Sequence, residues 1–222
     1  MAASTSKPTP IPSDAPNLPA WLTPRRLTIA GGVVAILLIV GYVVVMSGRR
    51  KERFSERALD QARSTAEAGQ LPQAATQFQQ VIQSYRGTDA AKEATLGLNQ
   101  IRLINNQNEL AVVNLREFLQ SNPGREFEVP GNGLLGVALE NSGQPAEAAA
   151  AYQKASDLAD VNYLKADYLI QAGRAWRDAG KKDQAIQAYE AVVQKYGDTP
   201  AATEAKVRLA ELTDGQRPLV TH

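Results

Sequence analysis

The chain has 222 residues, with 24 lysines and arginines against 23 acidic residues and a formal net charge of +1. A near-neutral balance disfavours a dedicated nucleic-acid binder, which is usually basic. Cysteine is absent, which excludes disulfide frameworks, cysteine-ligated metals and thiol nucleophiles. The only histidine is His222, so a histidine-based triad or metal site is also disfavoured. We expect a protein that is not an enzyme and that holds no cofactor or metal.

The first 26 residues contain six of the twelve prolines and offer little to bury. Such a composition is typical of extended chain without a core. We expect residues 1–26 to form a proline-rich tail. Two alternatives stay open, a floppy tail and a tail that a partner holds in place.

The next segment is the clearest signal in the sequence. From Leu27 to Ser47 there are 21 residues without a charge. A helix of this length spans roughly 30 Å, the thickness of the hydrocarbon core of a bilayer. A signal peptide would have a shorter apolar core, followed by a small-residue cleavage site. We predict a transmembrane helix over residues 27–48.

Basic and aromatic residues flank this predicted span. Arginines lie at 25–26, a basic juxtamembrane segment occupies 49–53, and Trp21 has the position of an interfacial anchor. Within the span, Gly31 and Ala35 form a pair of small residues four apart, a pattern that lets two membrane helices pack closely.

Beyond Arg53 the sequence has helical character and repeats itself. A glycine is followed five residues later by alanine and four residues after that by an aromatic residue, beginning at Gly69, Gly143 and Gly180. The separations of 74 and 37 residues imply a period of 37 and a fourth copy that begins at Asn106. Asparagine tolerates the left-handed conformation that ends a helix. Each copy therefore predicts a helical hairpin with a tight turn, a close approach at the alanine and an aromatic residue between neighbouring hairpins.

The fourth copy resembles the tetratricopeptide repeat. It has a small residue in mid-helix (Gly173), a large one (Trp176), a turn glycine (Gly180), then Ala185 and Tyr189. The third copy has Gly136 at the mid-helix position, whereas the first two have Ala62 and Asn99 there, so the resemblance is weaker in them. It implies an all-α array of about four hairpins over 54–214, before a short tail at 215–222.

The expected helices follow from the turns. The pairs are 54–68 with 71–85, 89–104 with 108–121, 130–142 with 145–159, and 162–179 with 182–196. The segment 121–133 is the longest expected break, and we interpret its GNG as a turn. A last helix over 200–214 would cap the array with Val207 and either Leu209 or Leu212. Five aromatic residues are expected to pack between helices: Phe78, Phe118, Tyr152, Trp176 and Tyr189.

The resemblance implies a groove lined by the first helices of the hairpins. Carried onto this sequence residue by residue, the groove positions are Asp167, Arg174, Arg177, Glu140, Asn141 and Gln100. They are candidates for binding a protein partner, and the alternative is an ordinary solvated face.

The side of the membrane that bears the repeats has two conflicting answers. Basic residues within about twenty positions of the span are more numerous on its C-terminal side, which places the repeats in the cytoplasm. The layout of a short tail, one span and a C-terminal repeat domain resembles the bacterial YfgM-like family. That family is ancillary to the SecYEG translocon, and its repeats face the periplasm. We favour the periplasm on this resemblance.

The sequence therefore predicts a single-pass protein of the bacterial inner membrane that acts as a non-catalytic scaffold or accessory subunit. Its partners would be other membrane or membrane-associated proteins and the lipid bilayer, with no nucleic acid and no small-molecule substrate. The alternatives are a periplasmic chaperone-like or translocon-associated module that binds exported clients, and more remotely an enzyme that uses carboxylates alone.

Overall fold

The computed structural model describes residues 24–213, except for the side chains of residues 24–31, 43–45, 47, 49 and 50. The predicted tails lie outside the described residues, apart from positions 24–26. The described chain is all-helical, and contacts divide the protein into two units, Met1–Arg49 and Arg50–His222. The helices are α1 (Pro24–Glu67), α2 (Leu71–Ser84), α3 (Asp89–Ile104), α4 (Asn108–Gln120), α5 (Arg125–Asn141), α6 (Pro145–Leu158), α7 (Asn162–Asp178), α8 (Lys182–Lys195) and α9 (Pro200–Thr213).

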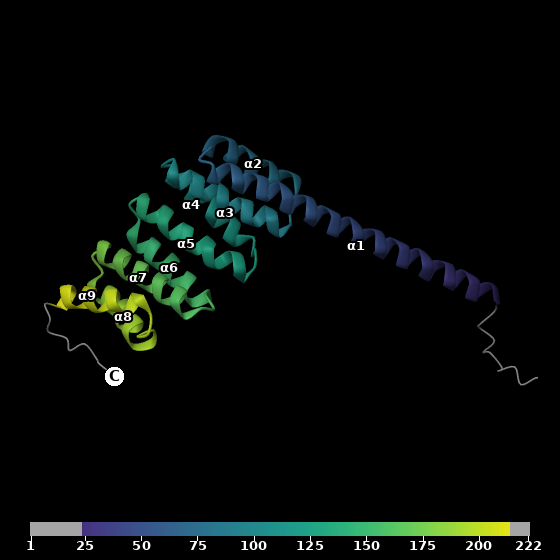
Figure 1. Ribbon diagram of the computed structural model, residues 1–222. Helices are drawn as coiled ribbons and strands as arrows, with labels where there is room; N and C mark the ends of the chain where they lie inside the picture. Colours follow the sequence, from purple (N-terminus) through teal and green to yellow (C-terminus); the bar gives the residue numbers. More distant parts are fainter. Residues whose placement is uncertain (1–23, 214–222) are drawn as a thin grey trace, which may run out of the picture. The chain divides into compact units, whose positions relative to one another are not determined.

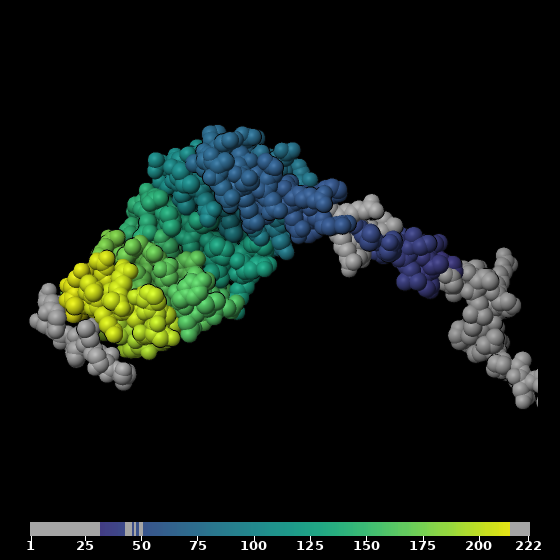
Figure 2. All heavy atoms as spheres, in the orientation of Figure 1, coloured from purple at the N-terminus to yellow at the C-terminus, as the bar shows by residue number. Residues whose placement is uncertain are grey.

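The first unit contributes the N-terminal part of α1. Among the described residues, no helix combines the length and the apolar character needed to cross a bilayer. Part of the predicted span, including Gly31, falls among the side chains that are not described, and Ala35 is exposed. The large apolar side chains between Val33 and Tyr42 are 52–69% exposed and lie on the surface (purple in Figure 2).

The second unit is a stack of helical hairpins that continues from the C-terminal part of α1 to α9 (Figure 1). The predicted turns are confirmed. Positive φ angles occur at Gly69 (77°), Gly143 (71°) and Gly180 (73°), and Asn106 adopts the same conformation with φ 56°. These residues end the first helix of each hairpin, so the period of 37 residues corresponds to one hairpin.

Two glycines let the helices of the last hairpins approach closely. A Cβ atom at Gly136 would lie 2.4 Å from the ring of Tyr152, and one at Gly173 would lie 2.4 Å from the ring of Tyr189. Each ring thus covers a glycine of its own hairpin, whereas the sequence suggested packing between neighbouring hairpins. Phe78 and Phe118 do reach the next hairpin, because their rings lie against Gly97 of α3 and Gly131 of α5.

The core of the second unit belongs entirely to that unit. Three clusters of buried apolar residues lie between successive hairpins and extend from Leu59 to Leu209. Phe78, Tyr152 and Tyr189 are buried in these clusters, Phe118 is buried outside them, and Trp176 is partly buried against two of them. Because this core needs nothing from residues before Arg50, we expect the repeat domain to fold as an isolated fragment.

α9 covers α7 and α8 as the predicted cap. It begins at Pro200, as expected, and buries Leu209, while Leu212 is partly buried. The expectation for Val207 was wrong, because this side chain is 53% exposed. Ala202, Ala205 and Leu209 form the packed face, at spacings of three and four residues, and Val207 lies outside it.

The predicted break at 121–133 was also wrong. α5 begins at Arg125, after Gly124 with φ 107°, and it includes Pro130 in its interior. The GNG sequence is therefore helix and not a turn. Its glycines are buried because Gly131 lies against Leu119 and Gly133 lies against Tyr168, where a Cβ atom would come within 3.0 and 2.8 Å.

Candidate functional site

A groove between the end of α1 and α3 lies on the side formed by the first helices. It encloses about 460 Å³. On α3 its lining residues include Glu93, Leu96, Gln100 and Ile104, which are three or four positions apart and so share one face of the helix. The other lining residues are Arg63, Ala66, Glu67, Leu71, Phe78, Gly97 and Ile101. Gln100, a residue predicted from the sequence, is thus part of a groove.

The floor of this groove is apolar and its rim is charged. Phe78 is buried beneath it, whereas Ile104 is 62% exposed. Arg63 and Glu93 form an ion pair from α1 to α3, with side chains 49% and 38% exposed. An exposed pair of this kind contributes little stability. An apolar floor with a polar rim is the composition of a surface that binds another protein.

The remaining predicted residues lie on α5 and α7 and do not line this groove. Three of them already bind neighbours. Asn141 donates to Asn108 at 3.3 Å, Arg174 donates to Gln171, and the Nε of Arg177 donates to Asp178 at 2.9 Å. Asp167 is exposed beside Tyr168. They occupy successive first helices, but the structure does not gather them into one pocket.

Glu140 differs from the others because its carboxylate has a buried partner. The hydroxyl of Tyr152 donates to its Oε2 at 2.6 Å. Burial raises the pKa of Tyr152 far above its usual range, and the hydrogen bond to Glu140 raises it further. The phenol therefore stays protonated and acts as a structural donor. In the part of the chain that the structure describes, no three acidic or histidine side chains are grouped to hold a metal.

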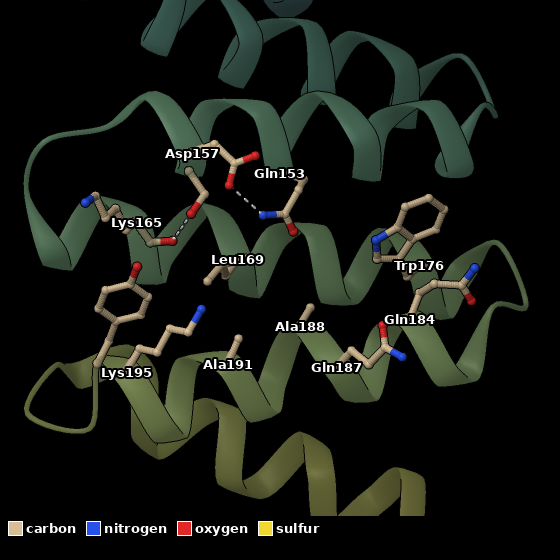
Figure 3. Close-up of a pocket in the computed structure, with 12 residues that line it drawn as sticks. Gln153, Asp157, Lys165, Leu169, Trp176, Gln184, Gln187, Ala188, Ala191 and Lys195 are labelled. Atoms are coloured by element: carbon tan, nitrogen blue, oxygen red, sulfur yellow. Dashed lines mark hydrogen bonds between the residues drawn. The ribbon is translucent and has the colours of Figure 1, made fainter.

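A second groove, also of about 460 Å³, lies between α6 and α8 with α7 as its floor (Figure 3). Leu169 lies at the floor, and the walls carry Gln153 and Gln187. Gln153 donates to Asp157 at 3.0 Å, and Ser156 donates to the carbonyl of Lys165 at 2.9 Å. The other lining residues are Trp176, Gln184, Ala188, Ala191, Lys195 and Tyr196.

The sequence did not predict this groove between α6 and α8, here called the outer groove. Its side chains come from three helices, and the polar ones are indistinguishable in sequence from those of any solvated helix face. One visible signal was Trp176, whose ring has the Nζ of Lys181 at 4.7 Å from its centre. This contact covers the ring by a cation–π interaction.

A family profile described as a tetratricopeptide repeat-like domain matches residues 45–172, and a tetratricopeptide repeat profile matches residues 167–199. No curated protein matches the chain.

Among solved structures, the crystal structure of MamA is 20% identical, with a TM-score of 0.58 over 73% of this chain and 82% of that one. Tetratricopeptide-like repeats of a kinesin light chain from Podosopora anserina are 18% identical, with a TM-score of 0.61 over 74% of this chain and 87% of that one. MamA from Desulfovibrio magneticus RS-1 is 20% identical, with a TM-score of 0.50 over 74% and 78%.

Similarity at these identities shows the fold alone. Tetratricopeptide folds are typically non-catalytic modules that bind other proteins. The repeats therefore suggest a scaffold for protein–protein interaction. Since the first profile covers more than half of the residues, the chain belongs to the tetratricopeptide repeat-like domain family.

Proposed function

We propose that this protein is a non-catalytic scaffold or accessory subunit that residues 27–48 anchor in the bacterial inner membrane. Its repeat domain holds a protein partner of a membrane complex in the groove between α1 and α3. The observation that carries the binding role is this groove, whose apolar floor remains open to solvent at Ile104.

Anchoring is supported by the sequence and by the exposure of α1. A soluble helix normally has one apolar face and one polar face. Leu27 to Ser47 has no charged residue on any face, and its described large apolar side chains are more than half exposed. Such a segment needs an apolar environment, and its length suits a bilayer.

A second function has support from the same groove. A periplasmic chaperone-like or translocon-associated module would bind exported chains while they are still extended. The row from Leu96 to Ile104, bordered by Glu67 and Glu93, offers apolar contacts and charges along one helix face. The resemblance to the YfgM-like family supports this alternative and a periplasmic location of the repeats.

Purification from native membranes in mild detergent, followed by mass spectrometry, separates the two functions. A structural subunit is expected to elute with its partners at a fixed ratio and to resist a salt wash. A client binder is expected to elute alone or with many substoichiometric exported proteins. The latter result would contradict the scaffold role and support the alternative.

Substitutions in the groove test the binding surface. Gln100→Ala with Ile104→Ser should reduce recovery of the partner, because it removes one polar and one apolar contact from the groove. Gln184→Ala with Gln187→Ala, on the outer groove, is the matched control and should leave recovery unchanged. Arg174→Ala with Arg177→Ala tests the predicted residues of α7 separately. Unchanged recovery in the groove variant would place the partner elsewhere.

The natural absence of cysteine makes the topology measurable without background labelling. Gln187→Cys in the full chain should react with a membrane-impermeant maleimide added to intact spheroplasts if the repeats are periplasmic. Labelling only after lysis would place the repeats in the cytoplasm, as the count of basic residues predicts.

A further inference from the structure

The beginning of the repeat domain carries a basic stripe around one exposed aromatic ring. On α1, Ser55 and Leu59 are buried against the core, whereas Arg53, Phe54 and Arg57 are exposed. Arg53 and Arg57 are four residues apart and therefore share one face of the helix. Phe54 is 56% exposed beside them, which is unusual for an aromatic side chain in an otherwise well-packed hairpin.

Contacts within the domain bring a further cation to this end. The Nζ of Lys51 donates to the carbonyl of Arg86 at 2.7 Å, and the backbone N–H of Asp89 donates to Oε1 of Glu52 at 3.2 Å. These two bonds fix the turn between α2 and α3 against α1. The exposed side chain of Arg86 therefore belongs to the same end of the domain as Arg53 and Arg57.

The nearby acidic groups are partly occupied. Glu52 accepts the Asp89 N–H, and Asp89 itself pairs with Lys92 at 2.8 Å. Among the described residues, no ion pair involves Arg53, Arg57 or Arg86, although Glu56 is exposed one turn away. Three guanidinium groups without an ion pair among the described residues thus lie at the end of the domain that carries the exposed ring, and this composition favours anionic groups beside an apolar phase.

We propose that Arg53, Phe54, Arg57 and Arg86, here called the lipid-facing stripe, bind anionic lipid headgroups while the Phe54 ring enters the bilayer interface. This inference rests on the proposed membrane anchoring. Phe54 follows Ser47, the end of the uncharged segment, by seven positions, so the chain permits at most about 25 Å between them in any arrangement of the two units. The stripe is therefore always within reach of the headgroup region.

Lipid is favoured over an acidic protein by the position of the stripe and by its composition. Arginines near a membrane surface are attracted to phosphatidylglycerol-type lipids, and an aromatic ring is typical of the water–lipid interface. The consequence is that the stripe would hold the first hairpin close to the bilayer and limit the orientations available to the groove between α1 and α3.

The test uses the full chain in nanodiscs of phosphatidylcholine and phosphatidylglycerol. Phe54→Trp is introduced together with Trp21→Phe and Trp176→Phe, so that residue 54 carries the only tryptophan. Quenching is measured twice, with bromine on the acyl chains of phosphatidylglycerol alone and then of phosphatidylcholine alone. The ratio of quenching by phosphatidylglycerol to quenching by phosphatidylcholine, corrected for the bulk lipid composition, reports the enrichment of anionic lipid around residue 54.

We expect strong quenching and a ratio above one. Each arginine near an anionic surface should contribute up to about a fivefold preference, so Arg53→Gln, Arg57→Gln and Arg86→Gln together should return the ratio to near one. The matched control removes three exposed cations from the last hairpin, Lys181, Lys182 and Lys195, by the same substitution to Gln. It should leave the ratio unchanged.

Three outcomes would overturn the proposal. A ratio of one in the parent chain, or a raised ratio that persists without the three arginines, would exclude the lipid-facing stripe. Absence of quenching with either lipid would place Phe54 in water or in a protein contact.

Alkaline extraction of the same samples is a separate readout. A chain that leaves the membrane would contradict the anchoring itself, whereas a retained chain with a ratio of one would contradict the stripe alone.

Discussion

The two C-terminal hairpins and the two N-terminal hairpins reach the same architecture with different side chains. In α5–α6 and α7–α8, a glycine faces a tyrosine at a separation that leaves no room for a Cβ atom. The equivalent positions of the first two hairpins hold Ala62 with Phe78, and Asn99 with Leu115. All four of these side chains are buried. Where the mid-helix residue is largest, the residue at the tyrosine position is smallest, so the summed volume of the two positions varies less than their residue types.

The largest predicted effect comes from filling one glycine position. Gly173→Ala would place a Cβ atom 2.4 Å from Cε1 of Tyr189, within a fully buried contact. Overpacking of this kind costs about 1–3 kcal/mol, and alanine recovers up to about 1 kcal/mol as a better helix former. We expect the free energy of unfolding of residues 50–222 to fall by about 1–2 kcal/mol. Urea denaturation followed by circular dichroism measures it.

The second hairpin supplies the control for that experiment. If volume is what the repeat conserves, Tyr189→Leu should be less harmful in the Gly173→Ala background than in the parent domain, as the Asn99 and Leu115 pairing indicates. Additive losses in the double variant would contradict the volume argument and would mean that the two sites respond independently.

The next largest effect is a pH dependence of stability that arises in the C-terminal hairpins. Burial raises the pKa of Tyr152, Tyr168 and Tyr189, and all three lie on α6–α8. The unfolded chain loses these phenolic protons near pH 10 and the folded chain retains them, so the unfolded state binds fewer protons above that pH. Their contribution is complete below about pH 10 and is lost as the pH rises, by up to about 1.4 kcal/mol per pH unit for each tyrosine.

Urea midpoints of residues 50–222 between neutral pH and about pH 11 check this prediction. Tyr152→Phe should reduce the alkaline fall in the free energy of unfolding by the contribution of one tyrosine. Phe78→Tyr should not add an equal contribution to the first hairpin, because the new hydroxyl would also need a hydrogen-bond partner. An unchanged alkaline slope in Tyr152→Phe would show that this phenol ionises at the same pH in both states.

The turns give a smaller contrast between the halves. Gly180→Ala keeps φ near 73° in open space, so the loss comes from backbone strain alone, about 1 kcal/mol. Asn106→Gly in the second hairpin should be neutral or stabilising by a few tenths of a kcal/mol, because asparagine already tolerates its φ of 56°. A loss on Asn106→Gly would mean that the asparagine side chain contributes more than its backbone conformation. Thermal unfolding of both variants measures the difference.

These turns explain why most of the fold was predictable. Glycine and asparagine adopt a positive φ at little cost, so Gly69, Asn106, Gly143 and Gly180 predicted the helix ends beside these four turns to within about two residues. The same reasoning failed at Gly131 and Gly133. There glycine serves close approach to Leu119 and Tyr168, a requirement that arises from contacts between helices and leaves no local pattern.

The candidate site was only partly predictable for the same physical reason. Gln100 was named because the resemblance to the tetratricopeptide repeat carries the groove positions of that family onto the first helices. The pairing of Arg63 with Glu93 was not found, nor was the outer groove around Leu169, because both depend on which side chains meet across helices. Val207 shows that even within one helix the sequence did not predict which apolar side chain is buried. A cap buries a single narrow face, and the choice between neighbouring apolar residues depends on the docking angle.

The smallest predicted effect distinguishes two tyrosines that occupy the same position of consecutive hairpins. Tyr152 donates to the Glu140 carboxylate at 2.6 Å, whereas the buried hydroxyl of Tyr189 has no hydrogen-bond partner among the described residues. Removing a satisfied hydrogen bond costs about 1 kcal/mol, so Tyr152→Phe should lower the free energy of unfolding by that amount. Tyr189→Phe should leave it unchanged or raise it slightly, since the variant no longer buries an unsatisfied hydroxyl.

Urea denaturation of the two variants at neutral pH, where both phenols are protonated, isolates the hydrogen bond from the alkaline effect. Glu140→Gln is the matched control, because it keeps an acceptor for Tyr152 and removes only the charge. Equal losses for Tyr152→Phe and Tyr189→Phe would mean that the Tyr189 hydroxyl also has a partner, such as an ordered water. Unequal losses would show that the last two hairpins, alike in their packing, differ in the one polar contact that links the core to the predicted groove residue Glu140.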